Sequence, residues 1–208
     1  MTTLDDPGVR VEEIAGRRTT VTRTTRETDV AVTLDLDGTG AADVSTGIGF
    51  YDHLLTSLAH HALFDLAIRA TGDLEVDDHH TVEDVALVLG SALGEALGDR
   101  SGIRRFGDAT VPMDESVATA VVDVGGRPYA VIDLPFHGER AGALSLQLVE
   151  HALEAFARTS GTTLHLHGTG RNDHHLAEAA FKALARALRA AVEPDPRRRG
   201  VASTKGGA

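Results

Sequence analysis

One six-residue motif occurs twice in this 208-residue chain, and the repeat limits the folds that the chain can adopt. Residues 78–83 read Asp-His-His-Thr-Val-Glu, and residues 173–178 read Asp-His-His-Leu-Ala-Glu, 95 positions later (173 − 78). An acidic residue followed by histidine precedes each copy, at 52–53 and at 150–151, and a stretch rich in Ala, Leu and Val follows each copy. Self-similarity at a fixed offset indicates an internal duplication, so we predict two equivalent halves.

The hydrophobic pattern predicts an α+β fold. Alternating apolar and polar residues predict strands within 9–23 and at 29–36, 63–70, 107–113, 116–124, 128–134 and 162–168. Apolar residues at helical spacing predict helices at 48–60, 80–97, 144–158 and 174–192. Each half is interpreted as a strand-strand-helix-strand-helix unit, a two-layer α/β sandwich, and the halves are expected to pack with pseudo-twofold symmetry.

The boundary between the halves is predicted at a glycine-containing turn over 98–102. The first repeat is then 1–98 and the second repeat is 99–193. No low-complexity linker separates them, so they are expected to form one packed unit. The tail at 194–208 is rich in Pro, Gly and Arg, a composition typical of a flexible segment.

Composition excludes several classes of function. The chain has 20 Lys and Arg against 31 Asp and Glu, a net charge of −11, which argues against a nucleic-acid partner because the phosphate backbone favours basic surfaces. The absence of cysteine excludes disulfides, thiolate zinc sites, iron–sulfur clusters and thiol nucleophiles. No apolar run approaches the roughly 20 residues of a membrane span, and the N-terminus lacks a signal-peptide pattern. We therefore expect a cytoplasmic protein with no membrane partner.

The repeated motif predicts two metal sites. Adjacent residues on a helix project about 100° apart, so the two histidines of one motif reach two different ions, while the glutamate shares a face with them. Two such helices could build two equivalent sites, each with one histidine from each pair and one glutamate. The eight candidate ligands are His53, His79, His80, Glu83, His151, His174, His175 and Glu178. Imidazole and carboxylate without thiolate suit Mn²⁺, Fe²⁺ or Zn²⁺.

Three alternatives accompany this interpretation. Asp78 and Asp173 are expected either to orient ring N–H groups or to cap their helices. The sequence Asp35-Leu-Asp37-Gly38-Thr39 resembles the first motif of haloacid-dehalogenase-type phosphotransferases, although a turn between two strands fits it better. The histidine-rich helices could also serve metal storage or hold a structural metal, but structural sites are usually coordinatively closed.

Ten motifs together resemble the imidazoleglycerol-phosphate dehydratase family of histidine biosynthesis, in its monofunctional form. They are Arg26-Glu27-Thr28, LDGTG at 36–40, GIGFYDHLL at 47–55, DDHHTVEDVAL at 77–87, GIRRFG at 102–107, PMDES at 112–116, GGRP at 125–128, EHALEAFA at 150–157, RNDHHLAEAAFKALARAL at 171–188 and STKG at 203–206. The resemblance covers nearly the whole chain. Because LDGTG belongs to the family pattern, the resemblance also removes most of the case for a phosphatase.

The resemblance implies an activity and an assembly. The enzyme would convert D-erythro-imidazole-glycerol phosphate into imidazole-acetol phosphate and water, with two Mn²⁺ ions per active site. A metal-bound imidazolate would expel the C3 hydroxyl through a diazafulvene-like intermediate, and a base would remove the C2 proton. The family assembles as a 24-mer, so the resemblance implies a homo-oligomer with active sites shared between subunits.

The resemblance also assigns roles to individual residues. Glu27 and Glu178 are expected to do acid–base and substrate-positioning work, and His53 is expected to act as a ligand or a proton carrier. The phosphate contacts carried over from the family are Arg105, Arg127, Ser203 and Lys205. The tail is then expected to close over the phosphate as a lid.

Overall fold

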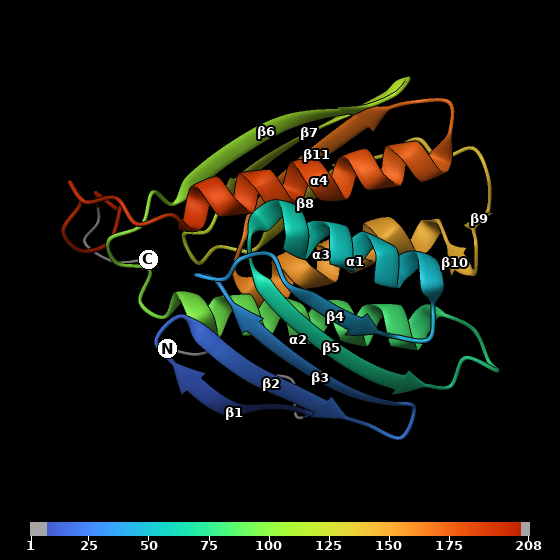
Figure 1. Cartoon of the computed structure of the whole chain (residues 1–208), viewed down its shortest axis with the longest axis horizontal. Helices are drawn as coiled ribbons and strands as arrows, with labels where there is room; N and C mark the ends of the chain where they lie inside the picture. The colour runs from blue at the N-terminus through green and yellow to red at the C-terminus, as the bar shows by residue number, and fades with distance from the viewer. Residues whose placement is uncertain (1–7, 205–208) are drawn as a thin grey trace.

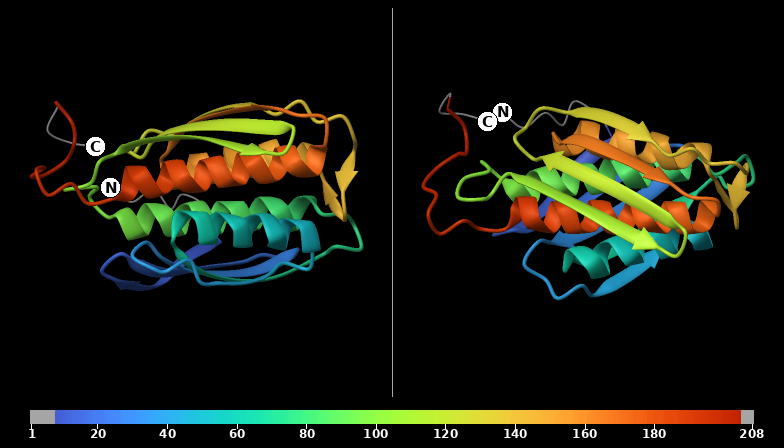
Figure 2. Two further views of the ribbon diagram at one scale, coloured as in Figure 1. Left: turned by 45° about the horizontal axis from the view of Figure 1, so that its top comes forward. Right: turned by 90° about the horizontal axis from the view of Figure 1, so that it is seen from above.

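The structure, a computed structural model, describes residues 8–204 and arranges them in four layers (Figure 1). A β-sheet lies on each outer side, and the four helices lie between the two sheets (Figure 2). The helices α1 and α2 pack on the first sheet, and α3 and α4 pack on the second. The two inner layers meet where α2 contacts α3 and α1 contacts α4. The predicted α+β fold is confirmed.

The first half has strand order β1-β2-β3-β5-β4. Its elements are β1 (Val9–Ala15), β2 (Arg18–Thr24), β3 (Thr28–Asp35), β4 (Ala42–Ser45), α1 (Gly49–Ala62), β5 (Asp65–Gly72) and α2 (His79–Leu97). The strands pair antiparallel except β4, which runs parallel to β5.

The second half repeats this arrangement with strand order β6-β7-β11-β8. Its elements are β6 (Phe106–Met113), β7 (Ser116–Asp123), β8 (Tyr129–Asp133), β9 (Arg140–Ala141), β10 (Leu144–Ser145), α3 (Gln147–Ser160), β11 (Thr163–Thr169) and α4 (Asp173–Val192). The edge strand β8 runs parallel to β11, as β4 does to β5. The strands β2-β3-β5-β4 therefore correspond to β6-β7-β11-β8, and β1 is an addition to the first sheet.

The predicted strand-strand-helix-strand-helix unit has too few strands before its first helix. Each half has a further strand before its first long helix, β4 in the first half and β8 in the second. The strand predicted at 128–134 corresponds to β8, so of these two only β4 was missing from the predicted ranges. β4 escaped the sequence pattern because it has four residues, lies at a sheet edge and is mostly exposed, so it shows no alternation of buried and exposed positions. The Asp35–Thr39 segment begins at the last residue of the antiparallel strand β3 and continues into the turn that leads toward β4, as the turn interpretation predicted.

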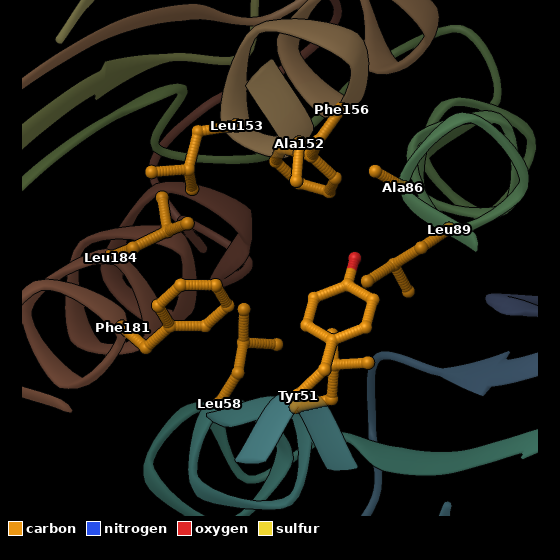
Figure 3. A pocket seen from close by; sticks show the side chains of 10 residues that line it. Tyr51, Leu58, Ala86, Leu89, Ala152, Leu153, Phe156, Phe181 and Leu184 are labelled. Carbon is orange, nitrogen blue, oxygen red and sulfur yellow. The ribbon is translucent and has the colours of Figure 1, made fainter. Parts of the chain in front are cut away.

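The four helices surround a small apolar cavity at the centre of the molecule (Figure 3). All four helices contribute to its lining, which consists of Tyr51, Leu55, Leu58, Ala86, Leu89, Ala152, Leu153, Phe156, Phe181 and Leu184. The Tyr51 hydroxyl donates to the Val82 carbonyl at 3.3 Å, and burial raises the pKa of that hydroxyl, so it stays neutral. The centre is hydrocarbon, and the chemically active groups lie at the helix ends.

Gly90 allows α2 and α3 to pack closely at this centre. A Cβ atom at this position would lie 2.1 Å from the Thr159 hydroxyl and 2.5 Å from the Phe156 carbonyl oxygen. Only glycine fits such an approach of two helices. Within residues 8–204, no helix is both long enough and apolar enough to cross a membrane.

Candidate metal centres

Both copies of the motif lie at helix N-termini at the same end of the molecule (Figure 1). The cap of each helix comes from the residue before the repeated aspartate. The His79 backbone N–H donates to Asp77 Oδ1 at 2.8 Å, and the His174 N–H donates to Asn172 Oδ1 at 3.0 Å. These bonds satisfy N–H groups that the helix itself leaves unpaired.

The expectation that Asp78 and Asp173 cap the helices or orient the rings is wrong. Both carboxylates instead hold the segment between β8 and α3. Asp78 accepts from Arg140 and from the backbone N–H and hydroxyl of Ser145, and Asp173 accepts from the backbone N–H groups of residues 137 and 138. Asp78 also keeps residues 144–145 extended as β10, so α3 begins at 147 rather than at the predicted 144.

The first candidate centre joins α1 to α4. His53 Nε2 lies 3.1 Å from Glu178 Oε1, and His174 Nε2 lies 2.9 Å from the same oxygen. Burial would raise the pKa of Glu178, but hydrogen bonds from Lys182 and His53 lower it to about 2, so the carboxylate is anionic. Both imidazoles are exposed, whereas the carboxylate is buried, so the centre is open on one side. An open side leaves room for a substrate.

The second candidate centre joins α2 to α3 by the equivalent residues. His79 Nε2 lies 3.7 Å from Glu83 Oε2, and His151 Nε2 lies 3.5 Å from Glu83 Oε1. The rings of His79 and His151 are 4.9 Å apart between centroids. In each centre the three ligand atoms lie within 4.8 Å of one another, which is a spacing that one ion can bridge.

These contacts revise the predicted pairing of ligands within one chain. Each centre takes its glutamate and one histidine from the same motif, and its second histidine from the opposite half. His79 and His174 join centres, whereas His80 and His175 join neither. The two histidines of each motif therefore point in different directions, as predicted. Within one chain, however, no centre combines a histidine of the first motif with a histidine of the second motif.

His80 and His175 are each held by a carboxylate that the sequence reasoning missed. His80 Nδ1 lies 3.0 Å from Asp73, and His175 Nδ1 lies 2.9 Å from Glu115. These hydrogen bonds raise the pKa of both imidazoles. In the neutral ring Nδ1 carries the proton, since a carboxylate only accepts, and Nε2 keeps its lone pair, which is the tautomer that a metal needs. Glu115 lies 60 residues from His175, so no local spacing signalled the contact.

Removing either carboxylate is expected to weaken metal binding. In Asp73→Ala and Glu115→Ala the ring tautomer is no longer held, and Mn²⁺ affinity should fall by about 10- to 100-fold. Asp73→Asn and Glu115→Gln keep an acceptor oxygen and should lose less. Calorimetric titration of metal-stripped protein with Mn²⁺ checks this, with Asp108→Ala, at an exposed strand position, as the control. Wild-type affinity in both alanine variants would contradict the role.

The expected phosphate ligands gather at the opposite end of α4. Arg105 donates two hydrogen bonds to Asp123, at 2.7 and 2.8 Å, and one to the Ala202 carbonyl at 2.5 Å. Its guanidinium stands 4.8 Å above the Phe106 ring. Arg127 lies nearby on the same side and lowers the pKa of Asp123 together with Arg105.

The tail lies against Arg105. Its contacts include a hydrogen bond from the Gly102 N–H to the Gly200 carbonyl and one from the Ser203 N–H to the Val201 carbonyl. Ser203 is thus placed next to Arg105 through Ala202. Lys205 lies outside the described residues.

Two ends of one chain therefore carry the two halves of the expected site. The Arg105 N–H donates to the Ala191 carbonyl, 17 residues along α4 from His174, which is about 25 Å at 1.5 Å per residue. Glu27 lies at the metal end, where its carbonyl accepts from the Asp73 N–H. One chain cannot place Arg105 and its own metal centres around one small substrate.

The residues present fit a divalent transition metal. His151 Nε2 is buried and has no hydrogen-bond partner, although it faces two other potential ligands, and a buried lone pair of this kind is costly unless something binds it. Nitrogen and carboxylate ligands in half-open centres are typical of catalytic metal sites. Because it combines a duplicated α+β fold with two such centres, this protein belongs to the class of candidate metalloenzymes.

Comparison with known proteins specifies the family. The imidazoleglycerol-phosphate dehydratase profile matches residues 46–188. An imidazoleglycerol-phosphate dehydratase from Acidiphilium cryptum is 55% identical over 192 residues, covering 91% of this chain and 98% of the relative. One from Methanoculleus marisnigri is also 55% identical, over 190 residues, with the same coverage.

Solved structures of the same family resemble this chain. The crystal structure of the Staphylococcus aureus imidazoleglycerol-phosphate dehydratase superposes with a TM-score of 0.77 at 34% identity, covering 85% of this chain and 98% of that one. The Pyrococcus furiosus structure, a complex with (S)-C348, gives a TM-score of 0.77 at 36% identity, covering 90% and 99%. The chain belongs to the imidazoleglycerol-phosphate dehydratase family, a family of hydro-lyases of histidine biosynthesis.

Proposed function

We propose that this protein catalyses the Mn²⁺-dependent dehydration of D-erythro-imidazole-glycerol phosphate to imidazole-acetol phosphate, as a cytoplasmic homo-oligomer. The observation that carries the proposal is the pair of half-open centres, His53–His174–Glu178 and His79–Glu83–His151. Two centres accommodate two ions, and imidazole with carboxylate suits Mn²⁺. When bound, the ions supply Lewis acidity toward the substrate's imidazole and hydroxyl groups.

The chain's own residues then bind, orient and transfer protons. Glu178 is anionic, and its Oε1 faces two imidazoles, so it acts chiefly as a metal ligand. His53 shares that oxygen and is exposed, which suits a ligand that also carries a proton. Glu27 lies beside Asp73 and His80 at the metal end and is the candidate base for the C2 proton.

Two features of the single chain support the proposal that active sites are shared between subunits. His80 and His175 have rings held at Nδ1 by carboxylates but belong to no centre in their own chain, and His175 Nε2 lies 3.8 Å from the exposed Asp114 carboxylate, beyond hydrogen-bond distance. The phosphate ligands lie about 25 Å from the same chain's centres, by the helix rise. Both features are accounted for if the metal end of one subunit meets histidines and arginines of others. The 24-mer implied by the family resemblance provides such contacts.

The decisive experiment measures turnover of imidazole-glycerol phosphate by metal-stripped protein before and after addition of Mn²⁺. Activity that appears only with Mn²⁺ is the expected result. Tight binding of Mn²⁺ without turnover and without binding of a phosphorylated imidazole would instead favour metal storage, because a storage protein has no use for phosphate ligands. Activity of the stripped protein without any metal would overturn the proposal.

The tail is expected to close over the substrate's phosphate. Truncation after Gly200 removes Ala202, Ser203 and Lys205, and with them hydrogen bonds to a charged group. The loss should raise KM by about 10- to 100-fold, with a smaller effect on kcat. Steady-state kinetics check this against a truncation after Lys205, which keeps all three residues. Unchanged kinetics after truncation at Gly200 would disprove the proposal that the tail closes over the phosphate.

A further inference from the structure

The internal duplication pairs Glu178 with Glu83 at an offset of 95 residues, and by the same offset it pairs Lys182 with Leu87. At this position of the repeat, one centre therefore has a cation where the other has an apolar residue. Lys182 Nζ lies 2.6 Å from Glu178 Oε2 and 3.5 Å from the Met113 sulfur. The lysine is one helical turn beyond the glutamate, so the helix itself brings them together.

The two oxygens of the Glu178 carboxylate have different partners. Oε2 accepts from the ammonium group, and Oε1 faces the imidazoles of His53 and His174. The carboxylate is almost completely buried, with 8% of its side chain exposed, so the ammonium group rather than solvent is the partner that holds Oε2 away from the centre. One oxygen remains for a metal ion.

Glu83 is arranged differently. Its Oε1 faces His151 and its Oε2 faces His79, so both oxygens are directed toward the second centre. Leu87, at the position of Lys182, is buried and offers no hydrogen-bond donor. Within residues 8–204, the cation nearest Glu83 is Arg158, whose Nη2 lies 3.6 Å from Oε1 and whose side chain is 65% exposed. Solvent screens a charge so exposed, and the distance is beyond a hydrogen bond.

We infer that Lys182 is a positioning residue that makes the two metal sites unequal. It restricts Glu178 to one coordinating oxygen and places a positive charge beside the ion, so the His53–His174–Glu178 site holds its ion more weakly than the other site. With Oε2 held by the lysine, Glu178 would also leave room beside a bound ion for the substrate. The inference rests on the proposed two-metal function. A histidine gained from a neighbouring subunit is the same kind of ligand for either site and does not remove the inequality.

The test compares Mn²⁺ binding to the full-length, metal-stripped wild-type oligomer and to Lys182→Met, which has a similar length but no charge and no N–H donor. Wild-type protein should show a strong and a weak site. In Lys182→Met the weak site should tighten by about tenfold or more, because a unit charge close to a divalent ion is removed. The kcat value should fall, because the second carboxylate oxygen occupies the substrate's position. A side chain that merely supports Glu178 would weaken binding on removal, which is the opposite change.

Three further variants keep the test decisive. Arg158→Met, which removes the exposed cation of the other centre, should leave both affinities within about twofold of wild type. Lys182→Arg keeps the charge and should keep the weak site weak. Lys182→Gln removes the charge but keeps a donor, and it replaces the methionine variant if that protein does not fold by circular dichroism.

The outcomes separate this inference from the proposed function. Two equal sites in wild-type protein with full Mn²⁺-dependent turnover would overturn the inference alone. Weakened or unchanged Mn²⁺ binding in the uncharged Lys182 variants would overturn it as well. Absence of both Mn²⁺ binding and turnover in wild-type protein would overturn the inference and the proposed function together.

Discussion

Replacing Glu178 by glutamine is expected to lower kcat by more than 100-fold, and replacing Glu83 by glutamine is expected to do the same. Each glutamate is the only carboxylate within its three-residue centre, and an amide supplies no negative charge to a divalent ion. Groups that merely orient ligands are worth about 10- to 100-fold, so loss of a direct ligand should exceed that range. Turnover and bound Mn²⁺ per chain should be measured on the same samples.

The matched control for both variants is Glu154→Gln. Glu154 is an exposed glutamate on α3, one turn beyond Glu150, and belongs to neither centre. It should retain wild-type turnover and wild-type metal content. Retention of turnover within a few fold in Glu178→Gln or Glu83→Gln would refute the assignment of that centre to the reaction.

Asp84→Ala is expected to be the most destabilising single substitution outside the hydrocarbon core. Asp84 is buried at the start of α2 and accepts hydrogen bonds from Arg23 on β2 and from the Thr28 hydroxyl on β3. Breaking a buried ion pair by removing one member costs about 3–5 kcal/mol. For a chain of this size that corresponds to a decrease in Tm of about 6–20 °C.

Thermal unfolding of metal-stripped protein at fixed concentration measures this effect without a contribution from bound metal. Asp29→Ala is the control, because Asp29 is exposed and accepts from the Thr24 hydroxyl at 2.9 Å. It should change Tm by no more than a degree or two, as surface substitutions usually do. Equal Tm values for the two variants would show that the buried network contributes no more than a surface contact.

Most of the candidate site could be predicted because its residues occur in a repeated pattern. The two Asp-His-His-x-x-Glu motifs and the upstream His53 and His151 marked all eight candidate ligands, six of which form the two centres. Lys182 could also have been found, since a lysine four residues after a glutamate on a helix is a recognisable pair. The sequence reasoning instead considered Asp78 and Asp173, the acidic residues adjacent in sequence, for ring orientation or helix capping.

Asp73 and Glu115 could not be found in this way. Glu115 lies in the turn between β6 and β7, and it reaches His175 only because β7, β11 and α4 pack together. A hydrogen bond across 60 residues leaves no periodic signal in the chain. The strand β4 was missed for a related reason, because its pairing with β5 rather than its own side chains makes it a strand.

The sequence by itself determined the duplication, the α+β class and the family, because each of these depends on local spacing: helical and strand periods, and motifs at a fixed offset. The tertiary structure alone decided which groups meet. It joined α1 to α4 and α2 to α3, so each centre combines residues of both halves. It also separated the metal end from the phosphate end by the length of α4. Distances of this kind arise from packing between elements, and packing is set by the whole core rather than by any segment.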